Sequence, residues 1–242
     1  MNKLFLREVA IKAGQVPPSY LDNVFPLSLN ESITVIIGEN GSGKSTLLEA
    51  IAIRLGCNPE GGGRNFTFVT ENTHSGLHEK IRVAKGYRRE KDIFFYRAET
   101  FYNLTTEIRR LDAVESFGPP IKSYYGGSDL HDISHGEAME ALYMNRFTAN
   151  GLYILDEPEA SLSPQRQLRF IIRICDLARQ GAQFLIATHS PLIIFTPGCS
   201  LLELAGGRLG SVDARRTDLV NLYKTVISSS GEYLNKAVDD CD

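Results

Sequence analysis

The sequence predicts an α/β fold with a mainly parallel central sheet flanked by helices. Three short runs are dominated by apolar, β-branched and aromatic residues, as in strands that are covered on both faces, and they lie at 33–37, 151–156 and 183–188. Amphipathic helical patterns follow the first two runs, at 44–55 and 164–180. Strands that alternate with helices are typical of a parallel sheet.

The first quarter of the chain is predicted to hold two strands and one helix. Residues 3–11 mix apolar and charged positions, which predicts a strand near the edge of a sheet. Three prolines within 14–31 predict turns and short extended pieces. A glycine-rich turn at 38–43 separates the strand at 33–37 from a helix that we expect to end at Gly56. The apolar stripe of this helix contains Leu47, Leu48, Ile51, Ala52 and Leu55.

The remaining elements are less sharply defined by the sequence. We expect strands at 66–70 and 92–97, a mixed segment at 100–133, a helix from about Ser134 to Phe147, strands near 200–204 and 207–212, and a polar helix near 215–228. In the helix over 164–180, the apolar face is predicted to contain Leu168, Ile171, Ile172 and Cys175.

Composition excludes several classes of protein. With 43% hydrophobic and 23% charged residues, the chain has enough apolar surface to fold, and a net charge of −3 argues against a strongly basic, duplex-coating protein. Its four cysteines form no CxxC pair, which excludes a zinc ribbon and favours a reduced, cytoplasmic setting. The sequence contains neither a signal-peptide pattern nor an apolar run long enough to cross a membrane, so we expect no membrane insertion.

A phosphate-binding pattern, GxxxxGK(S/T), lies between the strand at 33–37 and the helix that follows. Its glycines let backbone N–H groups turn inward around a polyphosphate, and the helix N-terminus adds positive charge. Lys44 is expected to reach the β- and γ-phosphates, and the Ser45 hydroxyl to coordinate Mg²⁺. The residues predicted to bind the nucleotide here are Asn40, Gly41, Ser42, Gly43, Lys44, Ser45 and Thr46.

Two further strand ends carry residues suited to nucleotide hydrolysis. The strand at 151–156 ends in Asp156, a predicted Mg²⁺ ligand, and a bend at Pro158 would let Glu157 polarise the attacking water. His189 follows the strand at 183–188 and is placed to donate a hydrogen bond to the γ-phosphate. The alternative for His189 is a capping or partly buried histidine.

These motifs resemble those of the ABC-class ATPases. Ser134-His135-Gly136-Glu137, 22 residues before Asp156, is similar to the signature motif of that class, although a plain helix-capping box is an alternative. In that class two subunits stack head to tail, and the signature of one closes on the ATP bound by the other. The resemblance therefore implies a homodimer formed on ATP binding, in which Ser134 and Gly136 complete the partner's site.

The resemblance also implies features that this sequence matches less well. The class has a Gln that senses Mg²⁺ and the γ-phosphate, and Glu99 is our candidate for that position and a third metal ligand. It also stacks the adenine on an aromatic side chain, for which we rank Phe25 ahead of Tyr20. We expect one domain over 1–242, with an antiparallel β subdomain and a small helical signature subdomain at about 100–148.

The process that ATP hydrolysis drives is less well defined. Only 35 residues separate Glu99 from Ser134, which is short for a transporter's helical subdomain. The motifs resemble stand-alone ATPases of the RecF and SMC-related branch, which implies a protein partner such as an effector or nuclease in DNA repair, chromosome handling or phage defence. The basic segment 80–91 allows nucleic-acid contact. The alternatives are a transporter's nucleotide-binding subunit and a module that holds ATP without hydrolysing it.

Overall fold

A six-stranded sheet forms the centre of the computed structural model, which describes residues 4–64, 75–114 and 118–239. In spatial order its strands are β5 (Asp92–Arg97), β6 (Gly151–Asp156), β7 (Gln183–Ala187), β3 (Ile33–Ile37), β8 (Ser200–Ala205) and β9 (Arg208–Ser211). All neighbouring pairs are parallel except β8 and β9. The predicted α/β fold with a mainly parallel sheet is confirmed.

A three-stranded antiparallel sheet forms the second layer, as predicted. Its order is β2 (Leu27–Ser28), β1 (Leu6–Ile11) and β4 (Ile81–Lys85). The prediction that the first strand lies near an edge is wrong, because β1 is the central strand. Its mixed composition reflects one face turned to solvent, where Glu8 forms an ion pair with Arg82 of β4 at 3.6 Å.

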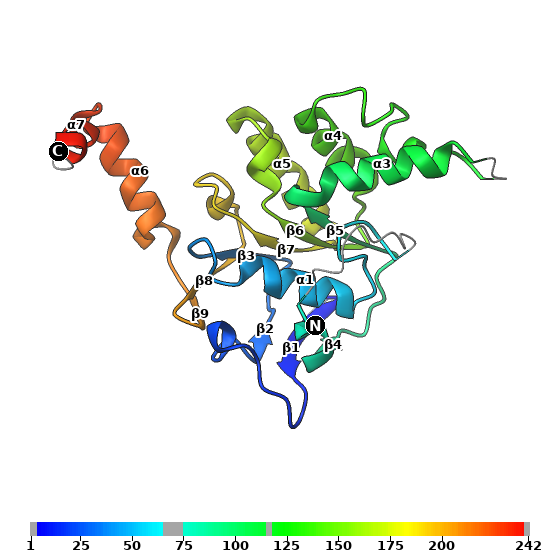
Figure 1. The fold of residues 1–242 in the computed structure, drawn as a ribbon, viewed down its shortest axis with the longest axis horizontal. Coiled ribbons are helices and arrows are strands. Elements are labelled where there is room, and N and C mark those ends of the chain that lie inside the picture. The colour runs from blue at the N-terminus through cyan, green and yellow to red at the C-terminus, as the bar shows by residue number, and fades with distance from the viewer. Residues whose placement is uncertain (1–3, 65–74, 115–117, 240–242) are drawn as a thin grey trace.

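Helix α1 (Lys44–Arg54) lies between the two sheets (Figure 1). Leu47, Leu48 and Ile51 are completely buried in a core that also contains Val9 of β1 and Leu185 of β7. Because sheets cover it on two sides, this helix is apolar over more than a single stripe. The loop at its N-terminal end is thereby fixed at the carboxyl end of β3.

Three helices cover the opposite face of the large sheet (Figure 1). They are α3 (Phe101–Asp112), α4 (His135–Ala141) and α5 (Pro164–Arg179), and a π-helical turn at Leu142–Arg146 follows α4. Successive residues of a strand pack into the cores on opposite faces of the sheet. Phe94 and Tyr96 of β5 pack on the side of these three helices, whereas Ile93 and Phe95 pack on the side of α1.

The apolar face predicted for the helix at 164–180 is partly wrong. In α5 the buried stripe is Phe170, Ile174 and Leu177, whereas Leu168 and Ile172 are exposed. Helix α3 also lies in a segment for which the sequence predicted no single element. Its apolar residues Phe101, Leu104 and Ile108 are buried against the sheet.

The C-terminal segment leaves the body of the molecule. Helices α6 (Asp218–Ser228) and α7 (Glu232–Asp239) follow β9 and project away from the central sheet (Figure 1). A short helix, α2 (Leu77–Lys80), precedes β4, and the strand predicted at 66–70 lies outside the described residues. Within the described ranges, no helix combines the length and apolar character needed to cross a membrane.

Candidate nucleotide-binding site

The loop from β3 to α1 has a backbone that only glycines accommodate well. Gly38, Gly41 and Gly43 have φ values of 152°, 78° and 103°. A Cβ atom on Gly38 would lie 2.4 Å from the Leu204 carbonyl oxygen, and one on Gly43 would lie 2.9 Å from the Tyr20 ring. Gly38 and Gly43 are therefore required by the local packing as well as by the turn, whereas Gly41 is required by the turn alone.

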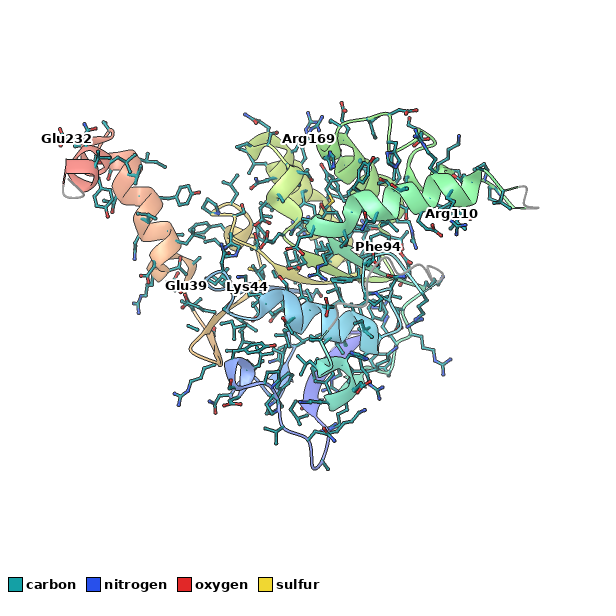
Figure 2. All side chains as sticks on the ribbon, viewed as in Figure 1. Glu39, Lys44, Phe94, Arg110, Arg169 and Glu232 are labelled. Carbon is teal, nitrogen blue, oxygen red and sulfur yellow. The ribbon has the colours of Figure 1, made fainter. Side chains whose placement is uncertain are left out.

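Lys44 directs its ammonium group back into this loop. Its Nζ donates hydrogen bonds to the carbonyl oxygens of Gly38, at 2.7 Å, and Glu39, at 2.9 Å. Burial lowers the pKa of Lys44, while the charges of Glu157, Asp156 and Glu159 oppose that shift. Figure 2 shows Lys44 and Glu39 at the end of α1 nearest the C-terminal helices. The lysine is therefore preorganised in the loop that the sequence assigns to phosphate.

Asp156 and Ser45 meet at the junction of β6 and α1. The Ser45 hydroxyl donates to Asp156 Oδ1 at 3.1 Å. Burial raises the pKa of Asp156 to about 6, against the opposing effects of the Ser45 hydrogen bond and the Arg97 charge. A hydroxyl and a carboxylate are hard oxygen donors of the kind that Mg²⁺ prefers, so this pair fits the predicted metal.

The chain bends sharply at Glu157, as its place before Pro158 suggested. Glu157 has φ 52°, in the left-handed region, and its N–H donates to the Ala187 carbonyl oxygen of β7 at 2.9 Å. The bend turns the Glu157 carboxylate toward His189, whose Nε2 lies 3.7 Å from Glu157 Oε1. Strained backbone of this kind is concentrated at functional sites.

A hydrogen bond fixes the backbone of His189, whereas its ring faces the Glu157 carboxylate. The His189 N–H donates to Glu159 Oε1 at 2.6 Å, whereas Nε2 is buried without a hydrogen-bond partner. Burial, followed by the charge of Lys44, lowers the pKa of His189, and Glu157 opposes the shift. The imidazole is therefore neutral near pH 7 and can donate one hydrogen bond.

One cavity of about 760 Å³ gathers most of the predicted residues. It is lined by Tyr20, Asn40, Gly41, Gly43, Lys44, Ser45, Thr46, Glu99, Glu157 and His189. A second cavity, of about 930 Å³, lies along the other side of the loop, where Ser42, Tyr20 and the start of α6 contribute to its wall. The structure thus brings Glu99, proposed from weak sequence evidence, to the same cavity as Lys44 and Glu157.

Sequence reasoning missed Arg97, which connects several of these groups. Arg97 ends β5 directly opposite Asp156 on β6. Its guanidinium donates to Glu49 of α1 at 2.6 Å and to Glu99 at 3.2 Å, and its Nε lies 4.0 Å from Asp156 Oδ2. The available signal was a charged residue at the end of an otherwise apolar strand, because Arg97 ends β5 in the same way that Asp156 ends β6.

The structure places the two candidates for stacking on the adenine differently. Phe25 is partly buried against the core that contains α1, and it lines neither of the two cavities. Tyr20 is partly exposed and lines both cavities beside Gly43. Of the two candidates, Tyr20 is the one that lies beside the phosphate-binding loop.

Ser134 and Gly136 lie on α4 and line neither of the two cavities around the loop. The Ser134 side chain caps α4 and exchanges hydrogen bonds with Glu137, so the predicted capping box is present. A Cβ on Gly136 would lie 2.7 Å from the Ser161 carbonyl oxygen, which explains the glycine.

Comparisons with known proteins match two parts of the chain to families of nucleotide-binding domains. Residues 19–115 match a family model described as "AAA domain", and residues 138–194 match one described as "AAA domain, putative AbiEii toxin, Type IV TA system". A protein of Caldanaerobacter subterraneus named "Putative ABC transporter ATP-binding protein" is 27% identical over 201 residues, which cover 78% of this chain and 82% of that protein. ABC transporter G family member 22 of Arabidopsis thaliana is 26% identical over 66% of this chain, which spans 23% of that protein's length.

Solved structures show the same fold. The ATP-binding cassette MJ1267 of an ABC transporter aligns with a TM-score of 0.55 at 18% identity, over 91% of this chain and 99% of that one. A nucleotide-free ATP-binding cassette from an ABC transporter aligns with a TM-score of 0.53 at 18% identity, over 90% and 95%. In fold and in sequence, the chain is therefore similar to ABC-type P-loop ATPase domains.

Proposed function

We propose that this chain binds and hydrolyses Mg·ATP and that ATP binding joins two copies head to tail. The observation that carries the proposal is the convergence of Lys44, Glu157 and His189 on one cavity, beside the Ser45–Asp156 pair. We further propose that residues 1–242 act as one domain in which about 100–148 forms the helical signature subdomain.

Each residue has a role that follows from its position. Lys44 would neutralise charge on the β- and γ-phosphates, and the Ser45 hydroxyl and Asp156 carboxylate would hold Mg²⁺, with Glu99 nearby as a third oxygen ligand. Mg²⁺ supplies positive charge at the phosphates when bound. Glu157 accepts the proton of the attacking water, a contribution worth roughly 10²–10⁴ in rate, and neutral His189 donates to a phosphate oxygen.

The second copy would complete each site through α4. The N-terminus of α4 offers backbone N–H groups and a partial positive charge, with Ser134 as the N-cap and Gly136 in the first turn. Release of phosphate would remove the shared ligand and let the copies separate, so that the chain works as a switch.

The relatives favour a transporter subunit over the DNA-repair, chromosome or phage-defence role that the sequence suggested. The Caldanaerobacter protein matches over most of both chains and is named as a transporter's ATP-binding protein. We therefore propose that the chain acts at the cytoplasmic side of a membrane, as the ATPase subunit of a separate membrane partner. The basic segment 80–91 gives little support to nucleic-acid binding, because Arg82 and Lys85 are paired with Glu8 and Glu90.

A role with a non-membrane effector is the second candidate. It is favoured by the toxin-related family model over residues 138–194 and by the short connection between Glu99 and Ser134. Affinity purification from native cells, with membranes solubilised, separates the two roles. Recovery of a membrane protein supports the transporter role, and recovery of a soluble effector or of nucleic acid without one overturns it.

Phosphate release from the purified protein tests the activity itself. We expect Glu157→Gln to bind ATP, to turn over at least about 10²-fold more slowly and to accumulate as a dimer. Lys44→Ala is the matched control that should lose nucleotide binding altogether. Wild-type turnover in Glu157→Gln would remove Glu157 from its role, and unchanged ATP affinity in Lys44→Ala would contradict the assignment of the phosphate-binding loop.

A further inference from the structure

The loops that follow β6 and β7 carry two residues of the candidate site, Glu157 and His189. These strands are parallel neighbours in which Asp156 lies opposite Ala187, so their loops leave the sheet side by side (Figure 1). The Glu157 N–H donates to the Ala187 carbonyl oxygen at 2.9 Å. Two residues further along each loop, the His189 N–H donates to Glu159 Oε1 at 2.6 Å. A side chain, rather than the backbone, therefore makes this second connection between the loops.

A hydrogen-bonded turn determines where Glu159 lies. Glu159 is part of the 3₁₀ turn Pro158–Ser161, which follows the bend at Glu157. The Ala160 N–H donates to the Glu157 carbonyl oxygen at 3.1 Å, and the Leu162 N–H donates to the Glu159 carbonyl oxygen at 2.8 Å. Glu157 and Glu159 thus belong to one short turn. A group that is bonded to Glu159 is therefore held in a defined position relative to Glu157.

The ring of His189 depends on its backbone for its direction. Its Nε2 is buried without a hydrogen-bond partner in the described part of the chain, and it lies 3.7 Å from Glu157 Oε1. The next residue, Ser190, is anchored to a different element, because its hydroxyl donates to Gln167 Oε1 of α5 at 2.6 Å. Glu159 thus supplies the side-chain bond that ties His189 itself to the turn that carries Glu157.

The Glu159 carboxylate occupies a position that is unfavourable for a charge. Burial raises the pKa of Glu159, and the hydrogen bond from the His189 N–H opposes that shift. The neighbouring charge of Glu157 raises the pKa further. Glu159 also lines neither of the two cavities around the phosphate-binding loop. An acid that is costly to bury and does not face the nucleotide is best explained by the short, charge-assisted hydrogen bond that it accepts.

We propose that Glu159 is a positioning residue for His189, whose backbone it holds so that the ring is directed at the phosphate oxygen to which it donates. The inference rests on the proposed hydrolysis of Mg·ATP and adds a residue that acts through His189 rather than on ATP itself. The expected effect is on the rate rather than on binding, because a preorganised donor acts mainly on charge that develops in the transition state.

Two substitutions separate the reach of this side chain from its charge. Glu159→Gln keeps an oxygen at the same position and loses the charge, whereas Glu159→Asp keeps the charge and is one methylene shorter. We expect Glu159→Asp to lower kcat by about tenfold with the Kd for ATP changed less than about twofold, because a small misplacement of a catalytic group slows the reaction. Glu159→Gln should retain kcat within about threefold, since an amide oxygen still accepts the bond. Similar kcat values in both variants, or a slower Glu159→Gln, would overturn the proposal.

Asp112→Ala is the matched control for a loss of stability. The Asp112 carboxylate at the end of α3 is also partly buried and accepts a hydrogen bond from a backbone N–H, that of Lys122 at 2.9 Å. It lines neither cavity around the loop. We expect Asp112→Ala to lower the urea midpoint and to leave kcat unchanged. If it lowered kcat as much as Glu159→Asp does, lost stability alone would account for the effect and the positioning role would be wrong.

Amide exchange reports the contact without any nucleotide. By NMR, the His189 N–H should exchange with solvent at least about tenfold faster in Glu159→Asp than in the parent protein or in Glu159→Gln, because its hydrogen bond is lost. Equal exchange in all three would remove the contact on which the inference depends, and faster exchange with an unchanged kcat would remove the positioning role. Absence of ATP hydrolysis in the parent protein would instead overturn the proposed function.

Discussion

Arg97 is expected to stabilise the nucleotide-free protein through its ion pairs at the candidate site, and Arg97→Ala tests this directly. The substitution removes a guanidinium that lies between Glu49, Glu99 and Asp156. The pair with Glu49 is the most protected, because the two side chains are only 20% and 8% exposed. Loss of the cation would leave the Glu49 carboxylate buried beside the end of β6.

The size of the effect follows from this burial. Removing one partner of a buried ion pair costs about 3–5 kcal/mol. Glu49 keeps one other hydrogen bond, from the Ser75 N–H at 3.1 Å, and Arg97 retains some contact with water. We therefore expect the lower end of the range, a loss of about 3 kcal/mol in the free energy of unfolding.

Urea unfolding of the nucleotide-free protein measures this loss. A double-mutant cycle with Glu49→Ala should give a coupling energy of about 1–3 kcal/mol, because removal of both partners leaves no orphaned charge. Arg179→Ala is the control, since Arg179 pairs with Asp176 at 2.7 Å but is 75% exposed, and it should cost less than about 0.5 kcal/mol. A loss in Arg97→Ala no larger than in this control would refute the reasoning.

Three further outcomes are expected. Asp156→Asn should stabilise the nucleotide-free protein at pH 7 by up to about 2 kcal/mol in urea unfolding. The pKa of Asp156 is raised to about 6 in the folded protein, so at pH 7 folding must bury a charge that asparagine does not carry. This gain should vanish as the pH falls to 4, because Asp156 is then protonated in the folded protein. Tyr20→Ala should weaken ATP binding by about tenfold, measured with a fluorescent analogue, while Phe25→Ala should not. Chelation of Mg²⁺ should abolish ATP binding in the same assay, and binding that persists would contradict the Ser45–Asp156 assignment.

The parts of the site that the sequence predicted depend on local requirements. A buried strand, a glycine turn and a helix must follow one another for the phosphate-binding loop, and all three are contiguous in 33–55. The bend at Glu157 could be anticipated for the same reason, because Pro158 comes next in the chain. Such features need no knowledge of which strands are neighbours.

The parts that it did not predict depend on packing between distant segments. Arg97 reaches Asp156 only because β5 and β6 pair in register, and their sequences are more than fifty residues apart. Tyr20 and Phe25 are both aromatic and close in the chain, and only the position of the core distinguishes them. In α5, apolar residues occur on two faces, so the pattern alone could not say that Leu168 is exposed.

The charges at the candidate site connect the binding of nucleotide and metal with the proposed dimer. The carboxylates that approach the site are Glu49, Glu99, Asp156, Glu157 and Glu159, and the cations among the described residues that face them are Lys44 and Arg97. ATP adds further negative charge, which Lys44 and the N-terminus of α1 offset in part. In the proposed dimer, Mg²⁺ and the positive end of the partner's α4 would offset more of this negative charge. Loss of the γ-phosphate removes the negative charge that attracted the partner, which gives hydrolysis a physical means of opening the dimer.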